Sequence, residues 1–294
     1  HMTRRYIVII GTMKSGTTTL FDVLARHPAI APASNKEPGF FAFDEIWSKG
    51  FDWFDTLFDF DPDRHLYRLE ASTDYTKAPF VTGVWDRMTA APDVEVKLLC
   101  IMRHPLRRLE SHARHVQVTR KEIGQQISPR PDHGLETGLS PVSLSASLYA
   151  SQLDQFSTAH AAGQLYCLTL EGLKADPKGT MEGVYDFLGL DSGAAEEELP
   201  VSNPASAKAR AHPLWRAAMR IRPLMALARG LLPEAMREKL KSRFRRQVKA
   251  EGRFRLTPAE EAALTTIYAS DLARLRDVYG IDTGTLWEID PPRR

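Results

Sequence analysis

The sequence has few cysteines and no long apolar run. Only two of its 294 residues are cysteine, and Cys100 and Cys167 each lie in an apolar, strand-like stretch. This distribution predicts buried, reduced thiols, with neither a disulfide framework nor a metal site, and so a cytoplasmic protein. No stretch approaches the ~20 apolar residues of a membrane-spanning helix. The five apolar residues between Arg5 and Gly11 are too few for the core of a signal peptide.

Charge is nearly balanced over the whole chain but not along it. The formal net charge is +2, and we expect no nucleic-acid partner. Residues 208–255, however, contain fifteen lysines and arginines against three glutamates. Such a bias is typical of a surface that meets an anionic ligand, an acidic acceptor or a membrane, and a solvated helix face accounts for it equally well. We expect residues 214–247 to be helical, and they are the candidate for peripheral membrane contact.

A phosphate-binding pattern opens the chain. The apolar, β-branched run 6–10 predicts a buried parallel strand, and residues 17–26 carry apolar side chains at helical spacing. Between them lies a turn bounded by Gly11 and Gly16. A strand, a glycine-bounded turn and a helix bring backbone N–H groups and the positive end of the helix dipole to one anion. The stretch therefore predicts a phosphate cradle.

Strands and helices alternate along the rest of the chain. Further strands are expected at 29–33, 66–71, 94–102 and 165–170, helices at 79–90, 105–120, 142–161, 176–189 and 257–279, and a long loop at 121–141. This alternation predicts an α/β, three-layer P-loop-like fold, in which a central parallel sheet of about five strands is flanked by helices and followed by C-terminal helices. We interpret residues 3–294 as one domain, with a core at 3–190 and a C-terminal loop and helical region at 196–290.

Ligands of such folds gather at the carboxyl ends of the strands. Four polar or charged residues lie at or near these ends: Lys14, Glu37, Ser72 and Arg103. In the triphosphate-binding loop Gly-x4-Gly-Lys-Ser/Thr a lysine follows the second glycine, whereas here Thr17 follows it and the lysine is Lys14. A kinase would also place an aspartate for Mg²⁺ where this chain has Arg103. The pattern predicts phosphate held by protein cations without a metal, with Arg103 and Ser111 holding a second phosphate.

Three segments resemble sulfotransferases that use 3′-phosphoadenosine 5′-phosphosulfate (PAPS). Residues 11–20 (GTMKSGTTTL) look like their 5′-phosphosulfate loop. The Arg-His-Pro sequence at 103–105, with Ser111 eight residues after the arginine, resembles their 3′-phosphate element. Residues 36–41 (KEPGFF) are similar to a segment of the branch that includes heparan sulfate sulfotransferases and many bacterial enzymes. The resemblance is specific from Gly11 to Ser111 and diffuse beyond.

The resemblance implies roles for individual residues. Lys14 would contact the phosphosulfate and support charge on the leaving phosphate, and Glu37 matches the glutamate proposed as catalytic base. The donor-binding residues would be Lys14, Ser15, Gly16, Thr17, Thr18, Arg103 and Ser111, with Lys208 and Arg210 from a loop over the 3′-phosphate. The expected acceptor contacts are Phe40, Asp74, Tyr75 and His112. The reaction implied is in-line transfer of a sulfonate from PAPS to a hydroxyl or amine of a small-molecule, glycan or lipid acceptor, without a metal.

Two departures from the family pattern lie on the acceptor side. Gly39 stands where a histidine is common in the heparan sulfate enzymes, and Ala71 stands where a lysine is common. We therefore expect the acceptor to be recognised differently. Two other functions remain open from the residues: a P-loop nucleotide kinase of unusual sequence, and a non-catalytic nucleotide-binding or membrane-associated module that uses the basic segment.

Overall fold

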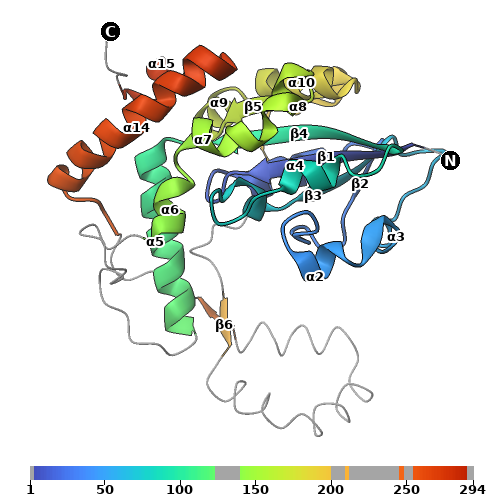
Figure 1. Cartoon of the computed structure of the whole chain (residues 1–294), viewed down its shortest axis with the longest axis horizontal. Coiled ribbons are helices and arrows are strands. Elements are labelled where there is room, and N and C mark those ends of the chain that lie inside the picture. Colours follow the sequence, from blue (N-terminus) through green and yellow to red (C-terminus); the bar gives the residue numbers. More distant parts are fainter. Residues whose placement is uncertain (1–2, 123–139, 200–208, 212–244, 248–253, 290–294) are drawn as a thin grey trace, which may run out of the picture. The chain divides into compact units, whose positions relative to one another are not determined.

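A computed structural model of the chain describes residues 3–122, 140–199, 209–211, 245–247 and 254–289 (Figure 1). Its contacts group the chain into two units. The first comprises His1–Ala113, Arg130–Ser202 and Arg255–Arg294, and the second comprises Arg114–Pro129 and Asn203–Phe254. The candidate site residues, apart from those near position 210, all belong to the first unit.

Among the described residues, one sheet of five parallel strands forms the centre of the first unit. Its strands are β1 (Arg4–Gly11), β2 (Ile30–Pro32), β3 (Tyr67–Ala71), β4 (Val94–Met102) and β5 (Leu165–Thr169), in the order β2-β3-β1-β4-β5. The apolar run of β1 is central because both of its faces are covered. Tyr6, Val8 and Ile10 enter one core cluster, while Ile7 and Ile9 enter the other. The expected three-layer fold, with a central parallel sheet of about five strands, is confirmed.

Helices cover both faces of this sheet (Figure 1). One face packs against α1 (Thr17–Leu24), α9 (Leu170–Ala175) and α10 (Pro177–Leu188). The other packs against α3 (Gly50–Asp55), α4 (Val84–Met88), α7 (Tyr149–Leu153), α8 (Ser157–Ala161) and α14 (Pro258–Tyr279). The other helices of the described residues are α2 (Asp44–Trp47), α5 (Pro105–Glu122), α6 (Pro141–Ser145) and α15 (Gly284–Trp287), with 3-10 turns η1 (Thr73–Thr76), η2 (Asp154–Phe156) and η3 (Ser192–Ala194). No helix in the described part of the chain is both long and apolar enough to cross a membrane.

The single helix expected at 142–161 is wrong. That segment is divided into α6, α7, η2 and α8. The break after α6 follows from its carbonyl groups, which accept hydrogen bonds from buried side chains elsewhere in the fold. Arg108 donates to the Ser143 carbonyl, the Tyr268 hydroxyl donates to Leu144 and the Gln152 amide donates to Ser145. A sequence window of this length contains Gln152 but neither Arg108 nor Tyr268, so its periodicity cannot reveal the break.

Two other helix boundaries also differ from expectation. The helix expected at 79–90 is confined to α4, because Gly83 before it has a left-handed φ of 72° and starts the helix there. In the second unit, residues 245–247 form a strand, β7 (Arg245–Gln247), which pairs antiparallel with β6 (Ala209–Ala211). These residues were expected to be helix and loop. The rest of the basic segment, 212–244, lies outside the described residues.

The last long helix begins as its sequence predicts. The Thr257 hydroxyl accepts a hydrogen bond from the Glu260 N–H at 3.3 Å, and the Glu260 carboxylate accepts one from the Thr257 N–H at 2.7 Å. With Pro258 at the first helical position, this pair of hydrogen bonds is a capping box. The helix ends at Tyr279. The next residue, Gly280, has a φ of 70°, which suits the residue after a helix.

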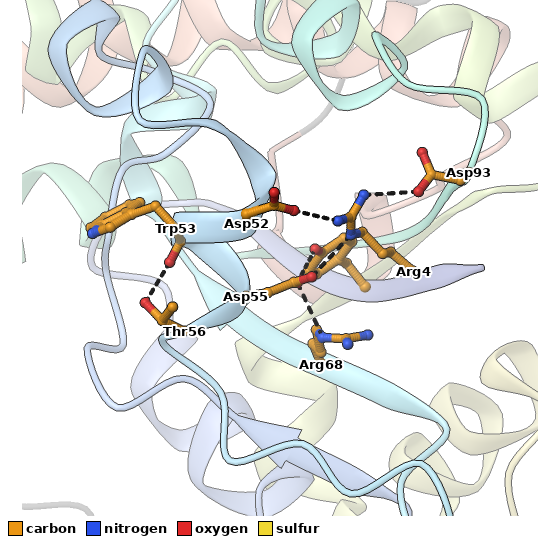
Figure 2. Close-up of polar contacts among 8 residues, drawn as sticks. Arg4, Asp52, Trp53, Asp55, Thr56, Arg68 and Asp93 are labelled. Carbon is orange, nitrogen blue, oxygen red and sulfur yellow. Dashed lines mark hydrogen bonds and ion pairs between the residues drawn. The ribbon is translucent and has the colours of Figure 1, made fainter. Parts of the chain in front are cut away.

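A charge network closes the amino end of the sheet, opposite the candidate site. Figure 2 shows Arg4 of β1 between three carboxylates, those of Asp52, Asp55 and Asp93, at 2.6, 2.9 and 2.8 Å. Arg68 of β3 forms an ion pair with the other oxygen of Asp55, with its Nε 3.2 Å from that oxygen. One carboxylate of α3 thus joins two neighbouring strands at the end that binds no predicted ligand.

Candidate active site

The phosphate loop, defined here as residues 12–16, is anchored at its base. The Thr12 N–H donates to the Ile101 carbonyl of β4 at 2.7 Å, and the hydroxyl oxygens of Thr12 and Ser15 are 2.6 Å apart. The Ser15 N–H also donates to the Thr12 carbonyl at 3.1 Å. Both side chains are fully buried. The hydroxyl of Ser15 therefore serves the loop itself.

Two residues of the phosphate loop have a left-handed backbone, Lys14 with φ 67° and Gly16 with φ 96°. At Gly16 the left-handed φ favours glycine, and a β-carbon would lie 2.7 Å from the end of the Leu170 side chain, which would have to move. Helix α1 starts at Thr17 with no acidic residue in its first turn. An anion at this helix start would meet the positive end of the dipole without competition from a carboxylate. Thr17 is buried there, and Thr18 is exposed.

Arg103 brings the second predicted phosphate element to the phosphate loop. It follows β4 directly, and its guanidinium donates to the Lys14 carbonyl at 3.4 Å. The Tyr149 hydroxyl donates to the Arg103 carbonyl, which fixes the backbone where the strand ends. Ser111 lies two turns further along, half-buried on α5. The fold thus joins Lys14 and Arg103, which are 89 residues apart in the chain.

Glu37 lies on a turn that is hydrogen-bonded to the residues that follow β3. Its carboxylate is 45% exposed and pairs with Lys36 at 2.8 Å. The N–H of Gly39 donates to the Ser72 hydroxyl at 2.9 Å, and the N–H of Phe41 donates to the Tyr75 hydroxyl at 3.2 Å. The turn is therefore anchored, while the carboxylate that it carries is open to solvent.

A comparison with known protein families shows to which family the chain belongs. The sulfotransferase domain family matches residues 4–276, which is nearly the whole chain. The chain belongs to the sulfotransferase family. The resemblance drawn from its sequence motifs is confirmed, and so is the fold. A crystal structure of a sulfotransferase from Alicyclobacillus acidocaldarius superposes with a TM-score of 0.61 at 21% identity, covering 98% of this chain and 100% of that one.

Among curated proteins, this sulfotransferase is similar to enzymes named for heparan sulfate. It is 30% identical to the heparan sulfate glucosamine 3-O-sulfotransferase 3B1 of Mus musculus, over 62% of this chain and 45% of that protein. It is also 30% identical to the heparan sulfate glucosamine 3-O-sulfotransferase 6 of Homo sapiens, over 62% of this chain and 52% of that protein. The chain spans about half the length of the curated relatives it matches.

The sulfotransferase also contains a buried acid beneath the Glu37 turn. Glu70 has no exposed surface, and the Ser72 hydroxyl that accepts from Gly39 donates to its carboxylate at 2.8 Å. Burial raises the pKa of Glu70 to about 8; the neighbouring negative charge of Glu37 adds to this, while the hydroxyls of Ser72 and Tyr75 oppose it. At neutral pH the group is therefore mostly the uncharged acid. No site role was predicted for Glu70; a glutamate within an apolar strand is the sequence signal that would have indicated one.

Two of the expected acceptor contacts have structural roles. Phe40 is fully buried, and its ring stacks on Phe54 with centroids 4.2 Å apart and planes 6° apart. Tyr75 is also fully buried, and its hydroxyl accepts from Phe41. A side chain without exposed surface offers no atom to an acceptor. In this sulfotransferase, Phe40 and Tyr75 instead build the core that carries the Glu37 turn.

The other expected site residues are distributed as follows. Asp74, half-buried in η1, pairs with Lys77 at 2.5 Å. His112 of α5 shares a hydrogen bond with the Ser143 hydroxyl at 2.6 Å between Nδ1 and Oγ. Lys208 lies outside the described residues, and Arg210 lies in β6, in the second unit, where it pairs in register with Arg246. Within the described part of the chain, no three His, Cys, Asp or Glu side chains gather as a metal site.

Gly39, one of the two departures from the family pattern named above, lies against an aromatic ring. It has a φ of 66°, and a β-carbon there would lie 2.7 Å from the Phe43 ring. The Phe43 side chain is 38% exposed although it is large and apolar. Phe43 therefore places a partly exposed phenyl ring against Gly39, two residues from Glu37 in the chain.

Proposed function

We propose that this sulfotransferase transfers a sulfonate group from PAPS to a hydroxyl or amine of an acceptor. The contact of Arg103 with the Lys14 carbonyl carries the proposal, because it places a second cation against the phosphate loop. PAPS has anionic groups at both the 3′ and the 5′ position, and so matches two neighbouring anion-binding elements. A nucleoside triphosphate has its charge on the 5′ side alone. The fit of Lys14, Arg103 and the start of α1 therefore favours a nucleotide with two separate phosphates.

The proposed mechanism gives each residue one task. PAPS supplies a sulfonate bonded to a phosphate that can leave. Glu37, whose carboxylate is accessible, takes up the proton of the acceptor as the acceptor oxygen or nitrogen bonds to sulfur. Lys14 stabilises the negative charge that the broken sulfur–oxygen bond leaves on the 5′-phosphate. Ser111 would add a hydroxyl at the 3′-phosphate, and the hydroxyls of Thr17 and Thr18 would contact the 5′-phosphate.

For the acceptor we propose a small molecule or a glycan. The curated relatives are named for heparan sulfate, which favours a hydroxylated acceptor such as a sugar. The side that faces it differs, however, because Gly39 and Ala71 carry no polar side chain and the Phe43 ring covers Gly39. We therefore expect an acceptor that presents an apolar or aromatic face next to the hydroxyl or amine to be sulfated.

The experiment combines donor binding with transfer. Lys14→Ala is compared with Lys178→Ala, an exposed lysine of α10. We expect Lys14→Ala to stay folded and to lower sulfonate transfer from PAPS by about 100-fold or more, because it removes charge stabilisation at the leaving phosphate. Lys178→Ala should transfer at the wild-type rate. The measurement is mass-spectrometric detection of a gain of one sulfonate in a mixture of candidate acceptors. Full activity of Lys14→Ala would exclude the assigned role.

Two ligands separate the alternative functions. Thermal stabilisation by adenosine 3′,5′-bisphosphate, with none from ATP and Mg²⁺, excludes a nucleotide kinase, and the reverse result would contradict the proposed donor. Stabilisation by the bisphosphate without transfer to any acceptor would instead support a non-catalytic nucleotide-binding module.

A further inference from the structure

A second arginine of α5 is completely buried beside the phosphate loop. Arg108 has no exposed surface, which is rare for arginine unless a carboxylate pairs with it. Its Nε donates to the Ser147 hydroxyl at 2.6 Å, one Nη donates to the Met13 carbonyl at 3.4 Å and the other donates to the Ser143 carbonyl. All three acceptors are uncharged. Among the described residues, no carboxylate forms an ion pair with this guanidinium.

Within the described residues, the charge of Arg108 is therefore held without a counterion. Burial, and then the nearby positive charge of Arg103, lower the pKa of Arg108. A guanidinium nevertheless stays protonated in proteins, so a positive charge remains inside the fold. An uncompensated buried charge destabilises the protein that contains it. Neighbouring Arg107 shows the ordinary alternative, since it pairs with the carboxylates of Glu110 and Glu261 at 3.1 and 3.3 Å.

The hydrogen bonds of Arg108 connect this charge to the phosphate loop. It holds the Met13 carbonyl, while Arg103 holds the next carbonyl, that of Lys14. Because the C=O and N–H of one trans peptide point in opposite directions, a Met13 carbonyl turned toward Arg108 turns the Lys14 N–H away from it. Two guanidinium groups thus fix two successive peptides of the loop that is to hold phosphate.

We propose that Arg108 is a positioning residue of the donor site, which orients the Met13–Lys14 peptide and adds positive charge that a bound phosphate offsets. The inference rests on the proposed function, because it takes the anion to be a phosphate of the donor. The serine and carbonyl partners that the described residues supply do not compensate the positive charge of Arg108. A donor phosphate bound at the phosphate loop would supply the missing negative charge. The Met13–Lys14 peptide, which Arg108 holds, would lie between the two charges.

The test separates stability from donor affinity. Arg108→Met removes the charge and keeps a long side chain, Arg108→Gln removes the charge and keeps hydrogen-bonding capacity, and Arg107→Gln is the matched control. Calorimetric titration with adenosine 3′,5′-bisphosphate gives Kd, and urea unfolding without ligand gives stability. We expect both Arg108 variants to bind about tenfold more weakly or worse, with unliganded stability unchanged or higher. Arg107→Gln should bind within about twofold of wild type.

Other outcomes overturn the inference. If the Arg108 variants fold less stably but bind the bisphosphate with wild-type affinity, Arg108 has only a structural role. If Arg108→Met does not fold, Arg108→Gln is judged by the same affinity criterion, and failure of both to fold also assigns Arg108 to the fold alone. If the wild-type protein itself does not bind adenosine 3′,5′-bisphosphate, the proposed function fails, and that result is distinct from any result on the variants.

Discussion

Replacing Glu70 with glutamine should remove a pH dependence from the stability of this protein. In the folded chain burial raises the pKa of Glu70 from 4.5 to about 8. Between those values the folded protein keeps a proton that the unfolded chain releases, so stability falls as pH rises. The contribution is fully present below pH 4.5 and is lost by about pH 8. The gap between the two pKa values corresponds to about 5 kcal/mol, or about 1.4 kcal/mol for each pH unit.

The assay is urea unfolding of the wild type and Glu70→Gln at pH 5.5, 7.0 and 8.5. The glutamine amide is uncharged at every pH and can still accept from the Ser72 hydroxyl, which donates to Glu70 at 2.8 Å. We expect the variant to gain about 3 kcal/mol relative to the wild type between pH 5.5 and 8.5, because the other titrating groups cancel in the difference. Glu95→Gln, at a residue whose carboxylate is 60% exposed, is the control and should show no such trend. Parallel pH profiles for wild type and Glu70→Gln would refute the assignment of a buried, protonated acid.

Two further predictions concern the site and the opposite end of the sheet. Glu37→Gln should lower the transfer rate by about 10² to 10⁴ and leave the Kd for adenosine 3′,5′-bisphosphate unchanged, because a general base acts on the acceptor; an unchanged rate would exclude it as the base. Asp55→Ala should lower the free energy of unfolding by about 3 kcal/mol, because it leaves Arg68, whose side chain is only 10% exposed, without its carboxylate. Asp52→Ala, at a carboxylate 94% exposed, should change it by about 1 kcal/mol or less, and equal effects of the two changes in urea unfolding would contradict the difference in burial.

Whether a site residue could be predicted from the sequence depends on how far its interacting partners are from it in the chain. Lys14 and Arg103 could be predicted together because each follows a parallel strand, and such strand ends meet at one edge of a sheet. Phe40 could not be assigned correctly, because a phenylalanine beside a candidate base suits an acceptor platform and a core position equally well. Its stacking on Phe54 decided for the core.

Which ionisable side chains are completely buried was not predicted from the sequence, for a related reason. Arg108 is one of several arginines and lysines on α5, and no local pattern distinguishes it from Arg107. The difference arises because Ser143, Ser147 and the phosphate loop enclose Arg108, whereas the acids of the same helix and of α14 reach Arg107. Glu70 is a comparable case, since its pKa follows from complete burial in a central part of the sheet.

The sequence by itself determined most local elements and the family. Apolar runs, the glycines at 11 and 16 and the capping box at Thr257 act within a few residues of one another, so they can be recognised without the fold. Only the tertiary structure decided which charges are buried, which helices break and which aromatic rings are covered. Those properties depend on contacts between residues distant in sequence, because burial and the pairing of polar groups are set by everything that packs around a side chain.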